Sequence, residues 1–251
     1  MFKDFSSFDG RRALVTGGTR GIGAAITELL LAGGAQVVTT SRSQVEPPAG
    51  AGHVRADVST AEGAATAVAG AVEQMGGLDL LVNNAGAATG HPAGITAIPD
   101  AEWVDALQAN FLTAVRTTAA ALPHLLEHGG AVVNVSSAVT LANVGPLAHY
   151  AAAKAALEQY SRTLAQDLAP RGVRVNVVVP GNVTTPGADL IREDFARAGG
   201  PSDEVLAAAT PLGRIGVPTD LASAVVFLLS DASSWVTGSS LVVDGGATVS
   251  A

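Results

Sequence analysis

The fold is decided by the stretch Thr16-Gly17-Gly18-Thr19-Arg20-Gly21-Ile22-Gly23, which joins a short hydrophobic strand to a predicted helix. Glycines at such a turn let the backbone approach a pyrophosphate, and the free N–H groups of the helix N-terminus bind the anion. A glycine cluster alone is common in surface turns, but the strand before it and the helix after it favour a nucleotide site. We therefore predict a dinucleotide-binding turn whose cofactor contacts are Gly17, Thr19, Arg20, Gly21, Ile22 and Gly23.

Along the rest of the chain, short strands alternate with alanine-rich helices. The expected strands are 13–16, 36–40, 78–82, 131–135, 173–179 and 240–243, and the expected helices are 21–32, 61–75, 102–127, 149–168 and 219–229. The strands are hydrophobic throughout, as parallel strands buried on both faces are. This alternation predicts a single-domain Rossmann fold over residues 1–251, an α/β architecture with a doubly wound, mostly seven-stranded parallel sheet and helices on both faces.

Several local signals refine this picture. Ser59 or Thr60 is expected to cap the second helix and Asp100 the third, and Pro123 is expected to kink or end the third helix early. Two long loops, 85–99 and 180–218, interrupt the pattern. The segment 184–214 is predicted to form a lid over the substrate, with one or two short helices of its own.

Composition excludes several classes of function. The chain has 22 acidic and 14 basic residues, a net charge of -8, which argues against nucleic acid or anionic membranes as partners. It has no cysteine, so disulfides and thiol chemistry are excluded. Neither a signal peptide nor a membrane-spanning stretch is evident. We expect a cytoplasmic protein that acts on small molecules.

The end of the second strand indicates which cofactor is used. An acidic residue about twenty positions after the glycines binds the ribose 2′-OH of NAD. Here Ser41 and Arg42 offer no carboxylate, and together with Arg20 they can hold a 2′-phosphate. The sequence therefore predicts NADPH/NADP+ and disfavours NAD(H), although Arg42 is alternatively a solvated surface arginine.

A second group of residues suggests a reacting centre. Tyr150 and Lys154 are four positions apart on one face of a helix. The positive charge of the ammonium can therefore lower the pKa of the phenol. Ser136 and Ser137 follow a buried strand, where a hydroxyl can orient a substrate oxygen. We prefer Ser137, because its position fits the alternation of side chains along the preceding strand. In isolation, a tyrosine and a lysine at this spacing are usually ordinary helix surface.

The combination resembles the short-chain dehydrogenase/reductase family, through its Thr-Gly-x-x-x-Gly-x-Gly turn and its Ser…Tyr-x-x-x-Lys signature. The resemblance implies that Tyr150 is the general acid or base and that Ser137 orients the carbonyl. It implies that Lys154 lowers the tyrosine pKa and grips the nicotinamide ribose. Asn110 matches the fourth member of the family's tetrad, which holds a water in the proton relay.

The resemblance covers nearly the whole chain. It implies adenine contacts from Asp57 and Val58, and further cofactor contacts from Asn84, Ala85, Gly86, Pro180, Gly181, Val183 and Thr185. It also implies a homotetramer, or a homodimer, built through the helices around Asn110 and Lys154.

These features predict an NADPH-dependent ketone or carbonyl reductase, or an alcohol dehydrogenase, acting on a small-molecule carbonyl or alcohol. Two alternatives are a 3-oxoacyl-thioester reductase and a cofactor-binding regulatory protein without turnover. Family members that reduce 3-oxoacyl thioesters usually carry basic residues just before the serine strand, where an acidic carrier protein docks. Residues 127–130 are not basic, and this disfavours the first alternative. His124 and His128 have metal-ligand spacing but no third ligand, so we expect no metal site. We expect His149 to point to a different helix face from Tyr150.

Overall fold

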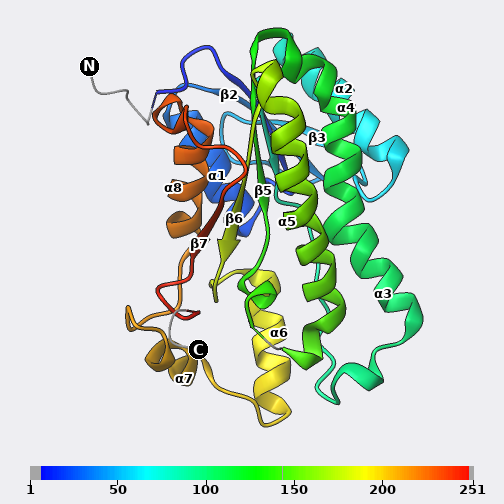
Figure 1. Ribbon diagram of the computed structural model, residues 1–251, viewed down its shortest axis with the longest axis vertical. Coiled ribbons are helices and arrows are strands. Elements are labelled where there is room, and N and C mark those ends of the chain that lie inside the picture. Colours follow the sequence, from blue (N-terminus) through cyan, green and yellow to red (C-terminus); the bar gives the residue numbers. More distant parts are fainter. Residues whose placement is uncertain (1–6, 143, 249–251) are drawn as a thin grey trace.

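The computed structural model of this protein describes residues 7–142 and 144–248. One seven-stranded sheet lies at its centre, in the order β3-β2-β1-β4-β5-β6-β7 (Figure 1). Every neighbouring pair of strands is parallel, which confirms the doubly wound sheet expected from the sequence. The strands are β1 (Arg12–Thr16), β2 (Gln36–Ser41), β3 (Gly52–Arg55), β4 (Leu80–Asn83), β5 (Ala131–Val135), β6 (Arg174–Pro180) and β7 (Ser240–Val243).

The edge strand β3 is absent from the strand ranges that the sequence suggested. Its sequence is Gly-His-Val-Arg, and all four residues are at least partly exposed. A strand with one β-branched residue and no buried side chain carries little hydrophobic signal. Pairing with β2 defines it.

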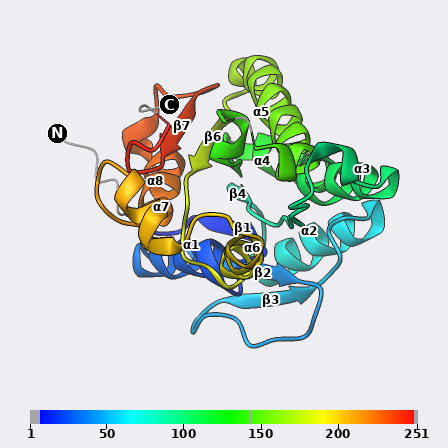
Figure 2. The same ribbon diagram turned by 90° about the horizontal axis from the view of Figure 1, so that it is seen from below.

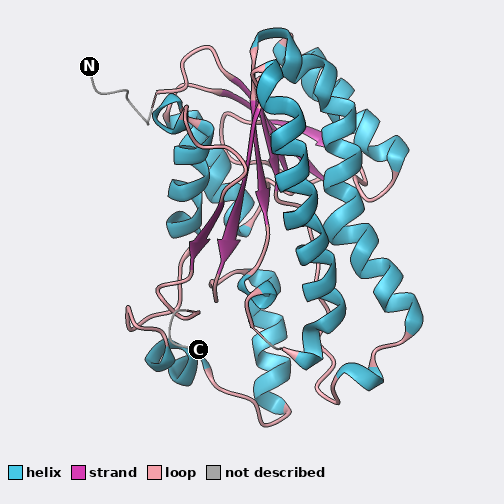
Figure 3. Cartoon of the chain, viewed as in Figure 1, coloured by secondary structure: helices cyan, strands magenta, loops and turns pink. Residues whose placement is uncertain are grey.

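Eight α-helices in the described residues surround the sheet (Figure 3). They are α1 (Gly21–Ala32), α2 (Ala61–Met75), α3 (Asp100–Leu107), α4 (Thr113–His128), α5 (Ala148–Leu168), α6 (Pro186–Arg197), α7 (Asp203–Ala209) and α8 (Pro218–Leu229). None of the helices in this part of the chain is long and apolar enough to cross a membrane.

Successive side chains of a strand point to opposite faces, and this divides the core in two. Ala13 and Val15 of β1 lie in one cluster with residues of α1 and α8. Leu14 lies in the other cluster, with residues of α2, α4 and α5. Figure 2 shows the two helix layers on either side of the sheet.

The helix boundaries correct two expectations. Thr60 caps α2 by accepting a hydrogen bond from the Gly63 N–H at 3.0 Å, but Asp100 is the first residue of α3 and not its cap. The long helix expected at 102–127 consists of α3, a π-helical turn at Gln108–Leu112, and α4. It does not end early at Pro123, because buried Ala121 and Leu125 anchor it on both sides of the proline.

The segment expected to form a lid contains two short helices, α6 and α7, as predicted. Both lie beyond the carboxyl ends of the strands (Figure 1). The buried Arg192 of α6 holds them together: its Nη1 donates to the Val183 carbonyl at 3.0 Å, and its Nε donates to Asp203 at 2.8 Å. Arg192 also pairs with Asp189.

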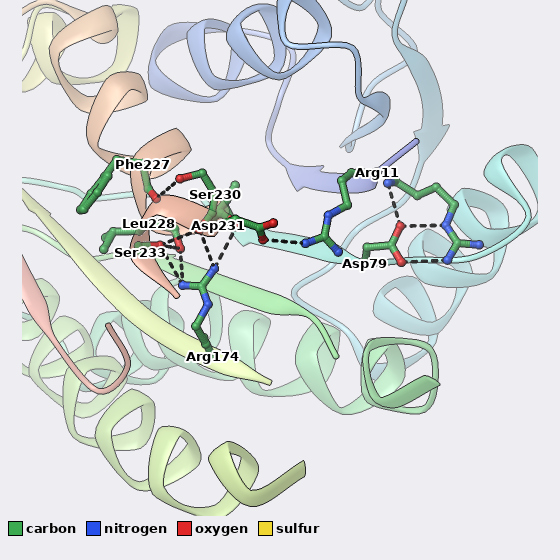
Figure 4. Close-up of polar contacts among 10 residues, drawn as sticks. Arg11, Asp79, Arg174, Phe227, Leu228, Ser230, Asp231 and Ser233 are labelled. Carbon is green, nitrogen blue, oxygen red and sulfur yellow. Dashed lines mark hydrogen bonds and ion pairs between the residues drawn. The ribbon is translucent and has the colours of Figure 1, made fainter. Parts of the chain in front are cut away.

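At the other end of the sheet, where the strands begin, arginines form several hydrogen bonds (Figure 4). Arg174, the first residue of β6, donates to the Leu228, Leu229 and Ser230 carbonyls at 2.7 to 3.1 Å. These are carbonyls at the C-terminus of α8, which have no partner within the helix. Arg12 grips Asp79 through two hydrogen bonds of 2.8 and 2.9 Å. This end is thereby closed by structural contacts, while the other end stays open.

Candidate active site

The turn after β1 is fixed to the turn after β4. The Thr16 hydroxyl accepts the N–H groups of Asn84 and Ala85 at 3.0 and 3.1 Å. The Asn84 side chain donates back to the Thr16 carbonyl at 3.0 Å. A Cβ at Gly23 would lie 2.2 Å from the Gly17 carbonyl oxygen, so only glycine permits this close approach of helix and turn.

A cleft of about 1460 Å³ runs along the carboxyl ends of the strands. All the residues expected to bind the cofactor line it: Gly17, Thr19, Arg20, Gly21, Ile22, Gly23, Ser41, Arg42, Asp57, Val58, Asn84, Ala85, Gly86, Tyr150, Lys154, Pro180, Gly181, Val183 and Thr185. The buried hydroxyl of Thr40, which also lines the cleft, has no hydrogen-bond partner in the described residues. A glycine-lined cleft with an unsatisfied hydroxyl fits a dinucleotide cofactor.

Charges at the far end of the cleft are arranged around Asp57. Its carboxylate accepts hydrogen bonds from the Ser59 hydroxyl at 2.7 Å and the Ser59 N–H at 3.1 Å, which lower its pKa. The positive charge of Arg42 lowers that pKa further. Ser41 bonds His53 of β3 at 2.8 Å, a contact that sequence reasoning missed because it depends on the pairing of β2 with β3.

Ser137 follows β5, while Tyr150 and Lys154 lie in the first turns of α5. The structure brings all three to the wall of the cleft. The Ser137 side chain hydrogen-bonds the Tyr150 hydroxyl. The Lys154 Nζ lies 5.7 Å from the Tyr150 ring centroid and donates to the Val135 carbonyl at 2.8 Å.

Burial governs the pKa values of Tyr150 and Lys154. Burial raises the pKa of Tyr150, and the hydrogen bond with Ser137 offsets this only in part. Burial outweighs that hydrogen bond, so the pKa of Tyr150 lies above its ordinary value. Burial also lowers the pKa of Lys154 to about 8, against the opposing effect of the Glu158 carboxylate. Both shifts favour the neutral form of the side chain concerned.

Glu158 is a functional candidate that the sequence did not reveal. It is buried, and its Oε1 accepts hydrogen bonds from Ser136 at 2.6 Å and Thr140 at 2.8 Å. The Ser136 hydroxyl is therefore bound to Glu158, whereas the Ser137 hydroxyl interacts with Tyr150. The available signal was its position four residues after Lys154, on the same helix face.

Asn110 lies in the π-helical turn between α3 and α4 and is almost fully buried. Its side chain donates to the Ala87 carbonyl at 2.7 Å and accepts the Ala87 N–H at 3.1 Å. It thus holds the start of the loop after β4 behind the reacting centre. Such π-turns are frequent at functional sites.

Unlike Tyr150, His149 is not among the residues that line the cleft, and it packs with other side chains. It is 3% exposed and packs edge-to-face against His91 and Trp103, with ring centroids 5.5 and 6.2 Å away. His91 Nε2 lies 2.7 Å from Glu102 Oε2. Burial, and to a smaller extent His91, lowers the pKa of His149. Sequence spacing gave no sign of this group, because its members come from a loop and two helices.

Comparison with known proteins agrees with this geometry. The family model described as Enoyl-(Acyl carrier protein) reductase matches residues 17–248. The chain belongs to the short-chain dehydrogenase/reductase family. As a member of it, the protein is an oxidoreductase, and the family implies a nicotinamide cofactor, NAD(H) or NADP(H).

Two curated relatives of this short-chain dehydrogenase/reductase illustrate its range. It is 39% identical to an uncharacterized oxidoreductase of Mycobacterium tuberculosis, over 99% of this chain and 96% of that protein. It is 36% identical to the 3-oxoacyl-acyl-carrier-protein reductase FabG of Salmonella typhimurium, over 96% of this chain and 98% of that protein.

Solved structures of the family superpose closely on the chain. Ligand-free aldohexose dehydrogenase of Thermoplasma acidophilum matches with a TM-score of 0.88 at 28% identity, covering 100% of this chain and 98% of the other. The crystal structure of gox2181 matches with a TM-score of 0.89 at 32% identity, covering 99% and 100%.

Proposed function

We propose that this protein is an NADP(H)-dependent carbonyl reductase or alcohol dehydrogenase. It transfers a hydride between the nicotinamide and a ketone or secondary alcohol. The observation that carries this proposal is the meeting of Ser137, Tyr150 and Lys154 on one wall of a cleft whose other end is the glycine turn. Family membership supports the oxidoreductase class.

In the reductive direction the cofactor supplies the hydride. The Ser137 and Tyr150 hydroxyls lie close enough to interact with each other, and on substrate binding each turns its O–H to donate to the substrate carbonyl oxygen instead. Burial keeps Tyr150 protonated, so its phenol donates the proton as negative charge develops on that oxygen. Ser137 orients the carbonyl and shares this charge.

Lys154 is the cation of the site. With a pKa of about 8, its ammonium carries a charge at neutral pH, close enough to the Tyr150 ring to stabilise the phenolate left by proton transfer. In this proposal it also holds the nicotinamide ribose. Asn110, bonded to Ala87 behind the site, positions a water through which the proton is replaced.

The test is NADPH oxidation with a panel of ketones and aldehydes, run beside Tyr150→Phe. Loss of the acid is expected to lower kcat/KM by roughly 10²- to 10⁴-fold, while NADPH binding measured by fluorescence persists. Tyr160→Phe, which removes the chain's other phenol, is the matched control and retains activity. NADPH binding without turnover in wild type would instead support a regulatory role.

The preference for NADP(H) is proposed from the second strand. Ser41 ends β2 and Arg42 follows it, and both line the cleft, with Arg20 facing it from the glycine turn. The Asp57 carboxylate at this end of the cleft follows β3 and not β2. A guanidinium pairs well with a phosphate, and a carboxylate at position 41 or 42 would repel it.

Arg42→Asp tests this preference. The variant is expected to raise the KM for NADPH at least about 10-fold and to leave the KM for NADH equal or lower, because one charge-assisted pair is worth about 1.5–3 kcal/mol. Arg171→Asp, at an exposed position away from the cleft, is the charge-matched control. An unchanged ratio of the two Michaelis constants would contradict the assignment.

The substrate side of the cleft supports a hydrophobic or extended carbonyl compound. Leu190, Ile191, Phe195 and Leu206 of the lid line it. A 3-oxoacyl thioester is the second candidate, favoured by the identity to FabG along almost the whole chain. Including 3-oxoacyl thioesters in the substrate panel separates the two.

We further propose a cytoplasmic homotetramer, with a homodimer as the simpler assembly. Ala152 and Ala155 on the exposed side of α5 allow close helix contact. Trp235 is 99% exposed, so it does not belong to the core and suits an interface. Light scattering coupled to gel filtration measures the number of subunits.

A further inference from the structure

Three potential metal ligands meet behind the substrate side of the cleft. They are His91 in the loop after β4, Glu102 on α3, and His149 at the start of α5. One ligand atom from each lies within 4.8 Å of the other two, and in the described residues no other group of three has this property. These side chains come from separate segments, so the fold itself brings them together.

The most informative member is His149. Only 3% of its surface is exposed, and its Nδ1 has no hydrogen-bond partner among the described residues. A buried polar atom without a partner costs about 1–3 kcal/mol. A bound ion close to the imidazole would remove that cost, since a neutral histidine is a common metal ligand.

We propose that His91, Glu102 and His149 form a site for a divalent transition metal, with zinc as the ion that suits two imidazoles and one carboxylate. Ligand atoms about 2.1 Å from a tetrahedral ion lie roughly 3.4 Å apart. The His91–Glu102 contact of 2.7 Å is shorter than this value, and the ligand atoms of all three residues lie within 4.8 Å of one another. On metal binding His91 and Glu102 move apart to hold the ion, with water as a fourth ligand.

An ion at this position would connect the loop that carries His91 to two helices. His91 is held by its N–H, which donates to the Pro146 carbonyl at 3.0 Å, just before α5. Its neighbours Gly90 and Pro92 line the cleft, and Gly90 packs against Phe195 of the lid. An ion on His91 would tie this wall of the cleft to α3 and to the helix that carries Tyr150.

The site is reachable from solvent, because the His91 and Glu102 side chains are 17% and 32% exposed. The test uses full-length protein without a histidine tag, stripped with a chelator and titrated with zinc chloride. Zinc retained after gel filtration is counted by mass spectrometry, affinity is measured by calorimetry, and cobalt(II) reports ligand geometry through its visible spectrum. None of these readouts depends on catalysis.

His91→Ala and Glu102→Gln are the test variants, and the double variant His124→Ala/His128→Ala is the control for the exposed histidine pair. We expect one zinc ion per chain in wild type and control, and affinity weakened by more than roughly 100-fold in both test variants, beyond the effect of losing an outer partner. Glu102→Gln keeps the side-chain shape, and its thermal unfolding without metal verifies its fold.

The proposal is overturned if wild type retains no zinc, if Glu102→Gln binds zinc as tightly as wild type, or if only the His124/His128 variant loses binding. In those cases His91 and Glu102 form an ordinary ion pair beside a core histidine. The outcome is independent of the proposed reductase activity.

Discussion

Replacing Glu158 with glutamine is expected to lower the pH at which the enzyme loses activity on the alkaline side. Lys154 has a pKa of about 8, and the Glu158 carboxylate is what opposes the lowering of that pKa by burial. Without this negative charge the ammonium is less stable, so Lys154 loses its proton at a lower pH.

The size of the shift follows from the geometry of α5. Residues four apart on a helix lie about 6 Å apart, and at an effective dielectric constant of about 20 two unit charges then interact by about 3 kcal/mol. That corresponds to about two pKa units. Allowing for water near the cleft, we expect the alkaline limb to move down by about one to two pH units.

The assay is the pH dependence of kcat/KM for NADPH at saturating carbonyl substrate, which reports groups in the free enzyme. Asp167→Asn is the matched control: it removes one carboxylate from an exposed position of the same helix and should not move the limb. Glutamine can still accept a hydrogen bond from Ser136 or Thr140. An alkaline limb that stays in place or moves upward in Glu158→Gln would refute the assigned role of Lys154.

Two further predictions concern stability. Arg174→Met removes the guanidinium donors to the C-terminal carbonyls of α8. Ser233 still donates to the Leu228 and Ser230 carbonyls, so the main loss is the bond to the Leu229 carbonyl, and the free energy of unfolding should fall by about 1–3 kcal/mol in urea titrations. Arg171→Met, at an exposed position, should leave it within about 0.5 kcal/mol. Thr60→Ala removes the cap of α2 and should cost about 1 kcal/mol, with Thr60→Ser restoring most of it; an Ala variant as stable as wild type would show that the cap bond contributes nothing.

The sequence predicted most of the fold because two signals agreed. The glycine turn requires a strand before it and a helix after it, and the hydrophobic strands alternate with helices along the chain. The sequence did not predict two elements with weak local signals. β3 has no buried side chain, and the π-helical turn at Gln108–Leu112 has no residue pattern that distinguishes it from an α-helix. Pro123 does not end α4, which continues to His128 with Ala121 and Leu125 buried on either side of the proline.

From the sequence, the glycine turn and the Tyr150–Lys154 spacing could be predicted as local features, and the resemblance to the short-chain dehydrogenase/reductase family implied the other residues of the cofactor cleft and the reacting centre. Only the tertiary structure decided their electrostatics. Burial raises the pKa of Tyr150 and lowers that of Lys154, and Glu158 opposes the second effect. The group formed by His91, Glu102 and His149 depends on how a loop and two helices pack. Contacts between segments far apart in the chain leave no periodic pattern in one sequence, and for that reason the structure was needed to find them.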